Sequence, residues 1–169
     1  MSDSLSPKAE FICNYLKNIG IEFFAATHDA AETLEKCAEI EKIIDGRICK
    51  NLFLQTTTGS AYYLLMMDSR KKFVTKNVSK AIGSSRLSFA NGEKMEEMLG
   101  TSPGSLSITS LVFDKDKKVS LVIDKDILNE EYICCHPCDC TSTIKIRTND
   151  VMNILIPSLG ITPVIIGIE

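Results

Sequence analysis

The sequence predicts an α+β domain with a mixed, mainly antiparallel, barrel-like sheet and flanking helices. Three observations support this fold class: the predicted strands outnumber the helices, hairpin turns join most neighbouring strands, and no βαβ rhythm appears. The chain has 169 residues, of which 44% are hydrophobic and 24% charged. This length suits one domain with a substantial core and is short for two, so we expect a single domain over residues 1–169.

The first half of the chain alternates helix signals with strand signals. Ser6 followed by Pro7 is typical of a helix start, and apolar residues then recur at helical spacing as far as Gly20. IEFFAAT (21–27) is predicted as a strand, and HDAAETLEKCAEI (28–40) as a helix that opens near Asp29. RICKNLFLQT (47–56) and AYYLLMM (61–67) are predicted to form a hairpin through TTTGS.

The second half begins with a short helix over Asn77–Ile82, a strand over 86–90 and a helix over Glu93–Leu99, followed by the loop TSPGSLS. SLVFD (110–114) and KVSLVID (118–124) are predicted as a second hairpin around DKDK. EYICCH (131–136) and TSTIKIRT (141–148) are two further strands. Thr148 is predicted to cap a helix through Ile156, and ITPVIIGI (161–168) to be the last strand.

Charge and hydropathy exclude several classes of protein. A net charge of −3 argues against a general nucleic-acid binder, and we expect no DNA partner. No apolar run approaches the roughly 18 residues of a membrane span, and MSDSLSPKAE lacks the features of a signal peptide. We therefore expect a cytoplasmic protein with reduced cysteines and no membrane partner.

One stretch of the chain is basic, although the net charge of the whole chain is negative. Between Ser69 and Gly92 there is no acidic residue, whereas six basic residues occur: Arg70, Lys71, Lys72, Lys76, Lys80 and Arg86. Such a segment could contact a few phosphates, although a solvated helix face is the simpler explanation from charge alone.

A lysine interrupts an apolar strand in RICKNLFLQ (47–55). If the run alternates as a strand does, Lys50 shares a face with Ile48, Leu52 and Leu54. An ammonium group among aliphatic neighbours has lost water and needs a compensating partner. The pattern therefore singles out Lys50 as a candidate functional residue.

The cluster CCHPCDC (134–140) permits several interpretations. Thiolates and an imidazole suit zinc, but structural zinc sites take two ligand pairs from separate segments, and the second pair is missing, so we predict no metal. A Cys–His nucleophile is the next possibility: strand neighbours Cys135 and His136 should point apart, whereas Cys134 and Cys138 remain open. His28, just before a helix, is more simply structural or surface-exposed than part of a cleft.

SPGSLS (102–107) is by itself a turn, although its backbone N–H groups could also hold an anion or a carbonyl oxygen. A strand lysine, a glycine-serine loop and a histidine in a strand-end His-Pro all donate hydrogen bonds, and none is an obvious strong nucleophile. This set suits a site that holds a polar substrate and activates a water.

The segments KNLFL, RLSFA, LGTSPGSLS, LVFDKDKKVSLVID, and CHP followed by TSTI occur in this order. From about Gly20 to Ile156 the chain resembles the freestanding prolyl-tRNA editing proteins of the YbaK/ProX superfamily, which are related to the editing insertion domain of bacterial prolyl-tRNA synthetases. The resemblance implies a cofactor-free α+β domain that hydrolyses the ester of a wrongly charged tRNA, typically alanyl-tRNA(Pro). It implies tRNA as partner, with prolyl-tRNA synthetase as a second candidate.

The resemblance also implies roles for particular residues. Lys50 matches the family's strand lysine and Asn51 the asparagine after it, both at the aminoacyl-adenosine end. Gly104 and Ser105 match the loop near the terminal adenosine, and His136 the histidine at the pocket. A water helped by a ribose hydroxyl would carry out the attack. Candidate phosphate contacts along the acceptor stem are Lys71, Lys72, Lys76 and Lys80.

Three points remain open at this stage. Ile108 stands where the family loop has proline, and Cys140 where an asparagine is common, so Cys140 could alter the acyl pocket and leave cysteine or serine as alternatives to alanine. Asn51 faces away from Lys50 on an ideal strand, so either a bulge or strand end turns it, or it acts through its backbone. A non-catalytic tRNA- or synthetase-binding module is the alternative to an enzyme.

Overall fold

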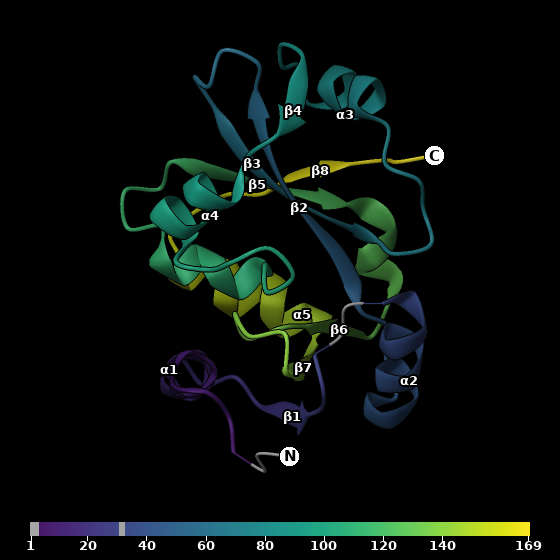
Figure 1. The fold of residues 1–169 in the computed structure, drawn as a ribbon, viewed down its shortest axis with the longest axis vertical. Helices are drawn as coiled ribbons and strands as arrows, with labels where there is room; N and C mark the ends of the chain where they lie inside the picture. Colours follow the sequence, from purple (N-terminus) through teal and green to yellow (C-terminus); the bar gives the residue numbers. More distant parts are fainter. Residues whose placement is uncertain (1–3, 31–32) are drawn as a thin grey trace.

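The computed structural model describes residues 4–30 and 33–169, in which two sheets form the framework (Figure 1). The smaller sheet has the strand order β1-β7-β6 and the larger β4-β2-β3-β5-β8. The strands are β1 (Phe23–Thr27), β2 (Cys49–Thr56), β3 (Tyr62–Asp68), β4 (Leu87–Phe89), β5 (Val119–Asp124), β6 (Tyr132–Cys135), β7 (Ser142–Arg147) and β8 (Val164–Ile166).

The first half follows the predicted order, with one shifted helix start. Helix α1 (Pro7–Asn18) begins as predicted, because the Ser6 side chain accepts a hydrogen bond from the backbone of Ala9. Helix α2 (Leu34–Ile44) begins after the predicted start near Asp29, because Thr33 is the capping residue. Residues 31 and 32 of that predicted helix lie outside the described residues. Strands β2 and β3 form the predicted antiparallel hairpin.

The predicted second hairpin is wrong. SLVFD lies in η1, a 3-10 helix over Ile108–Phe113, because Ser107 caps this turn and Ser110 bonds back to the Ser107 backbone. Without that partner, β5 pairs in parallel with β3 on one side and with β8 on the other. Helices α3 (Thr75–Ile82) and α4 (Gly92–Leu99) occur where short helices were predicted.

The C-terminal helix also differs from its prediction. Thr148 is the first helical residue rather than the cap, and its hydroxyl donates to the Glu130 carbonyl at 2.6 Å. The helix runs as α5 (Thr148–Asp150), a π-helical turn η3 (Val151–Leu155) and α6 (Ile156–Ser158). Pro157 lacks the N–H group that a regular helix would use there, which accounts for the wider turn before it. A further 3-10 helix, η2, spans Lys125–Asn129.

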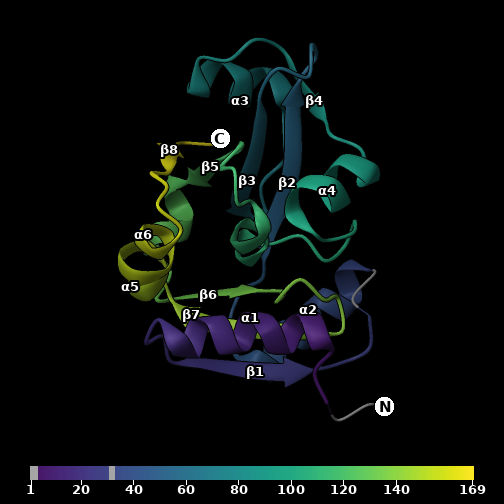
Figure 2. The ribbon, with the colours of Figure 1, turned by 90° about the vertical axis from the view of Figure 1, so that its left-hand side faces the viewer.

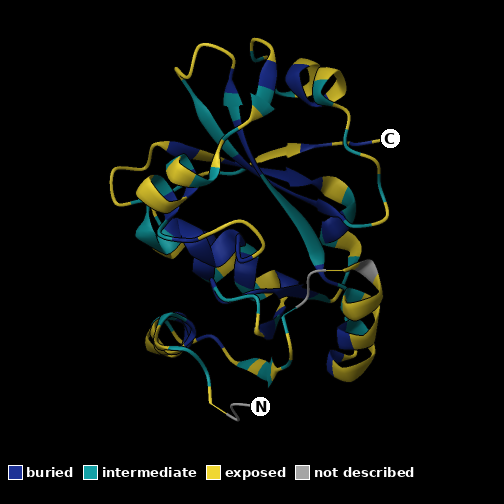
Figure 3. Ribbon diagram, in the orientation of Figure 1, coloured by how far each residue is buried: buried dark blue, intermediate teal, exposed yellow. Residues whose placement is uncertain are grey.

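The α+β class is confirmed, and the sheet is curled rather than closed into a barrel. Antiparallel pairing joins β1–β7, β2–β3, β2–β4 and β6–β7, so the described strands are mainly antiparallel. The two sheets meet at a parallel bridge between Ile48 and Cys134. Figure 2 shows α1 running alongside the smaller sheet. Figure 3 shows that β3 and β5, in the middle of the larger sheet, are mostly buried.

Three buried clusters position the site. The main core lies between the sheets and includes Phe53, Leu64 and Ile144. A second cluster joins β2 and β3 to α3, and a third joins α2 to the bridge through Ile40, Ile44, Ile48 and Cys134. No helix in the described ranges is long and apolar enough to span a bilayer.

Helix α2 is fixed at its C-terminal end. The Lys145 ammonium group donates to the Ile44 and Asp45 carbonyls at 3.2 and 2.7 Å, which satisfies carbonyls that a helix end leaves open. Gly46 then lets the chain pass close to Cys134, whose Sγ would lie 2.5 Å from an added Cβ. These contacts set the position of α2 over the smaller sheet.

Candidate functional site

On one face of β2, Lys50 lies between the second buried cluster, which contacts α3, and the third, which contacts α2. The β2–β3 register is unbroken from Cys49 to Gln55, so side chains alternate between faces. Ile48 on this face packs under α2, and Leu52 packs against the α3 cluster. The Lys50 ammonium group donates to the Lys71 carbonyl at 2.9 Å, and it has no carboxylate partner among the described residues. Its charge is thus available to a ligand.

Asn51 projects from the opposite face, toward the main core that contains Phe53. The unbroken register excludes the bulge that could have turned it toward Lys50. Its Nδ2 donates to the Cys49 carbonyl at 3.1 Å, whereas its Oδ1 is buried without a hydrogen-bond partner among the described residues.

His136 is buried and fixed by its neighbours. The Ser142 carbonyl can only accept, so the Nδ1 of His136, 2.8 Å away, carries the proton. The backbone carbonyl of His136 accepts from Ser107 Oγ at 2.5 Å and from Thr109 Oγ1 at 3.1 Å. Burial lowers the pKa of His136, and nearby His28 lowers it further. The ring is therefore neutral at pH 7, with Nε2 as an acceptor.

The strand lysine, the serine loop and the histidine segment converge. Ile48 bridges Cys134 in parallel, and Lys50 and His136 each lie two residues further along in the same direction. Ser107, at the end of SPGSLS, is hydrogen-bonded to His136. The fold therefore brings together the three segments that the sequence singled out.

Gly104 and Ser105 lie in the expected turn. The backbone N–H of Ser105 donates to the Ser102 carbonyl at 3.0 Å, and Gly104 has φ +90°, a left-handed value that favours glycine. Gly104 is exposed and Ser105 buried. No hydrogen bond between described residues joins either one to His136. Cys140 is half-buried beside Thr141.

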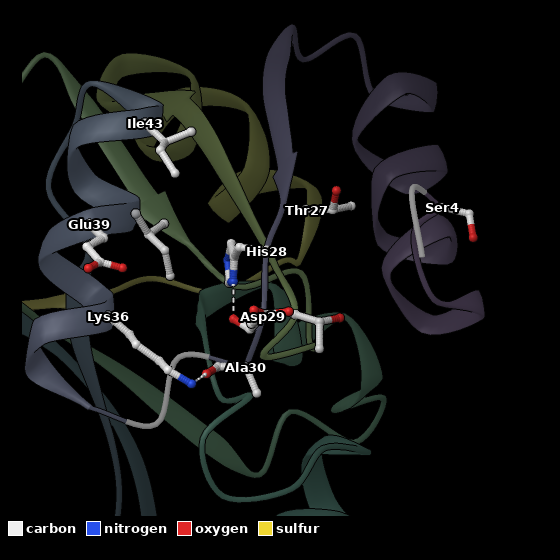
Figure 4. Close-up of a pocket in the computed structure, with 10 residues that line it drawn as sticks. Ser4, Thr27, His28, Asp29, Ala30, Lys36, Glu39 and Ile43 are labelled. Atoms are coloured by element: carbon white, nitrogen blue, oxygen red, sulfur yellow. Dashed lines mark hydrogen bonds between the residues drawn. The ribbon is translucent and has the colours of Figure 1, made fainter. Parts of the chain in front are cut away.

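A cavity of about 530 Å³ adjoins the histidine segment between α2 and the end of β1 (Figure 4). We call it the His28 cavity; it is lined by Ser4, Thr27, His28, Asp29, Ala30, Lys36, Glu39, Ile40, Ile43 and Thr141. His28 Nε2 lies 2.8 Å from Thr143 Oγ1, which is 3.5 Å from His136 Nδ1. His28 is thus linked to His136, a role that its position before a helix did not reveal.

Three buried polar atoms in the described part of the chain have no hydrogen-bond partner: Asn51 Oδ1, Thr101 Oγ1 and Ser142 Oγ. They lie in the lysine–asparagine strand, in the loop that contains SPGSLS, and beside the His-Pro segment. Buried unpaired polar groups are rare in folded proteins and call for a specific explanation. Their location in these three segments fits groups that pair with a ligand or with ordered water.

The four candidate phosphate-binding lysines fall into two groups. Lys71 forms ion pairs with buried Asp124 at 2.9 Å and with Asp126 at 2.6 Å, and is only 18% exposed. Lys72, Lys76 and Lys80 are exposed, and none forms an ion pair with a described residue. The second group is therefore better placed to meet a phosphate.

Cys49, Cys134, Cys135 and Cys138 are held as thiols. Burial raises the pKa of Cys49 to about 12 and that of Cys134 to about 11, and it raises the pKa of Cys135 and Cys138 as well. Cys138 Sγ lies 3.4 and 3.5 Å from the hydroxyls of Ser110 and Thr109. Within the described ranges, no group of three or more His, Cys, Asp or Glu residues is placed to hold a metal ion.

Comparison with known proteins identifies the family. The model of the aminoacyl-tRNA editing domain matches residues 28–154. The chain belongs to the aminoacyl-tRNA editing domain family. It is accordingly an aminoacyl-tRNA deacylase, a hydrolase whose macromolecular substrate is an aminoacylated tRNA.

Two curated relatives of this editing domain cover most of the chain. The prolyl-tRNA editing protein ProX of Acetoanaerobium sticklandii is 29% identical over 140 residues, which are 83% of this chain and 85% of that protein. The prolyl-tRNA synthetase associated domain-containing protein 1 of Danio rerio is 24% identical over 157 residues, 92% of this chain and 84% of that protein.

Solved structures share the fold of this editing domain. A crystal structure of a proposed trans-editing enzyme for prolyl-tRNA synthetase superposes with a TM-score of 0.74 at 16% identity, covering 98% of this chain and all of that one. The crystal structure of a hypothetical protein superposes with a TM-score of 0.68 at 14% identity, covering 94% of this chain and 98% of that one. At these identities the likeness concerns the fold alone.

The lowered pKa of His136 predicts a loss of stability on acidification. The folded-state pKa lies below the ordinary value of 6.5, so the unfolded chain binds the proton more readily, and stability falls as the pH drops below about 6.5. Urea unfolding of wild type and His136→Asn between about pH 7.5 and about pH 5 tests this. The variant should show a shallower decrease over this window; equal slopes for wild type and His136→Asn would contradict the prediction.

Proposed function

We propose that this deacylase hydrolyses alanyl-tRNA(Pro) in trans. The observation that carries the proposal is that the strand with Lys50 meets the segment with His136 at the Ile48–Cys134 bridge, while Ser107 of the serine loop is hydrogen-bonded to His136. His136 is in turn linked to the His28 cavity through Thr143 and His28. The name of the 29% identical relative, a prolyl-tRNA editing protein, supports the choice of tRNA. We place this activity in the cytoplasm, with prolyl-tRNA synthetase as a partner through their shared tRNA.

The proposed substrate follows from the limited ability of a synthetase pocket to reject amino acids smaller than its own. A synthetase pocket built for proline cannot strongly reject a smaller amino acid, because a lost methylene changes binding by only ~1–3 kcal/mol. A second site that admits the small acyl group and excludes proline completes the selection. Cys140, half-buried beside cavity-lining Thr141, would influence which small acyl group fits.

In the proposed reaction, Lys50 donates a hydrogen bond to the ester carbonyl oxygen, or holds the terminal phosphate. A water adds to the carbonyl carbon, the ester C–O bond breaks, and the ribose oxygen leaves with a proton, while a neighbouring ribose hydroxyl helps to orient the water. The Gly104–Ser105 backbone would hold the terminal adenosine, and neutral His136 would shape the acyl pocket. Asn51 would act at the same end through its backbone.

A single-turnover deacylation panel tests the proposal. We expect fast hydrolysis of alanyl-tRNA(Pro), with prolyl-tRNA(Pro) left intact; cysteinyl- and seryl-tRNA are included because Cys140 leaves those acyl groups open. Hydrolysis of only a cysteinyl or seryl ester would reassign the substrate. Binding of tRNA without hydrolysis of any ester would instead favour a non-catalytic binding module.

A further inference from the structure

A second cavity of about 530 Å³ lies between α3 and β4 and shares no lining residue with the His28 cavity. We call it the α3–β4 pocket; it is lined by Val74, Thr75, Lys76, Ser79, Arg86 and Leu87. Its lining contains two cations, two hydroxyl groups and no carboxylate. The chemistry of these groups suits an anion.

The two cations are not neutralised internally. Arg70 and Lys71, earlier in the same stretch, pair with Asp68 and Asp124. Lys76 and Arg86, in contrast, are exposed and form no ion pair with any described residue. Because no acidic residue occurs between positions 69 and 92, the positive potential of the pocket is retained.

An exposed aromatic ring adjoins the lining of this pocket. Phe89 is 60% exposed and meets Phe73 edge to face, with ring centroids 5.3 Å apart. Phe73 directly precedes Val74 of the pocket lining, and Phe89 shares a face of β4 with Leu87. An exposed flat ring beside cations is the combination by which proteins stack a nucleobase and hold its phosphate.

The pocket is within reach of the proposed ester site. The ammonium group of Lys50 contacts the Lys71 carbonyl at 2.9 Å, and Val74 of the pocket follows Lys71 by three residues. Three residues of extended chain span at most about 11 Å. An RNA strand whose 3′ end lies at Lys50 would therefore reach the pocket within a few nucleotides.

We propose that the α3–β4 pocket binds the tRNA a few nucleotides from its 3′ end, with a backbone phosphate between Lys76 and Arg86 and a base stacked on Phe89. This inference rests on the proposed function for the direction of the strand. It adds Arg86 and Phe89 to the lysines that the sequence suggested.

Salt-dependent binding of uncharged tRNA separates the two contacts. Arg86→Gln should weaken binding about fivefold and reduce the slope of log K against log salt by about 0.7, as expected for one lost phosphate contact to a single strand. Phe89→Ala should weaken binding about tenfold with an unchanged slope, because stacking involves no counterion release. Lys118→Gln is the matched control, since Lys118 is exposed and its ion pair among the described residues is with Asp116.

Kinetics on a hydrolysed ester complete the test: both variants should raise KM and leave kcat unchanged. If Arg86→Gln and Phe89→Ala bind tRNA as the control does, the inference is overturned, whereas hydrolysis by the wild type would leave the proposed function standing. If both variants show the expected loss of binding but the wild type hydrolyses no ester, the pocket assignment holds and the proposed function fails. Thermal unfolding of each variant checks that the loss is local.

Discussion

Replacing Lys50 with methionine is expected to reduce single-turnover deacylation about 100- to 1,000-fold, the effect of removing one hydrogen-bond donor to a developing oxyanion. Methionine keeps the length and apolar character of the side chain, so packing between Ile48 and Leu52 is retained while the charge is lost. The bond to the Lys71 carbonyl is also lost, at a cost of about 1 kcal/mol in stability. Rate constants at saturating enzyme, together with urea unfolding, separate these two effects.

Lys118→Met is the matched control for that experiment. Lys118 precedes Val119, which pairs with Tyr62 at one end of β3, whereas Lys50 pairs with Met67 near the other end. The control should hydrolyse esters at the wild-type rate. A rate for Lys50→Met within twofold of wild type on every hydrolysed substrate would remove Lys50 from the proposed mechanism.

Replacing Lys71 with methionine is expected to destabilise the protein by about 3 kcal/mol or more, because removing one partner leaves a buried charge uncompensated. Asp124 is fully buried, and the Lys71 ammonium group lies 2.9 Å from its carboxylate. In the described part of the chain, the remaining donors to Asp124 are the backbone N–H groups of Asp68 and Asp126, at 3.4 and 3.3 Å. Urea unfolding at pH 7 measures the loss.

Lys72→Met provides the adjacent control, since Lys72 is exposed and should change stability by no more than about 0.5 kcal/mol. At temperatures where both variants are folded, the salt dependence of tRNA binding should change for Lys72→Met only if Lys72 meets a phosphate. If Lys71→Met leaves the free energy of unfolding unchanged but reduces the salt dependence of tRNA binding, Lys71 contacts the tRNA and does not stabilise the fold.

The sequence correctly predicted those helices and strands whose ends are determined by residues close by in the chain. Ser6 with Pro7 predicted the start of α1, and the β2–β3 hairpin followed from its apolar runs and turn. The prediction failed for SLVFD, because apolar residues alone do not distinguish a short strand from a turn of 3-10 helix. The hydroxyls of Ser107 and Ser110 decided that case by bonding to the local backbone.

In the candidate site, too, the sequence predicted the features that depend on the local backbone and missed those that depend on distant contacts. The strand pattern correctly placed Lys50 and Asn51 on opposite faces, because alternation depends only on the local backbone. It could not show that Lys71, in the basic stretch, is committed to Asp124, because that pairing joins residues far apart in the chain. Nor could it show that His28 connects with His136 through Thr143.

By itself, the sequence determined the α+β class, the family resemblance and the three segments that form the candidate site, because these depend on local periodicity and on the order of motifs. Only the tertiary structure decided which groups meet there. The parallel bridge between Ile48 and Cys134 joins the strand that contains Lys50 to the segment that contains His136, and the packing of α2 encloses the His28 cavity. Contacts of this kind depend on strand pairing between distant segments, which local periodicity does not specify.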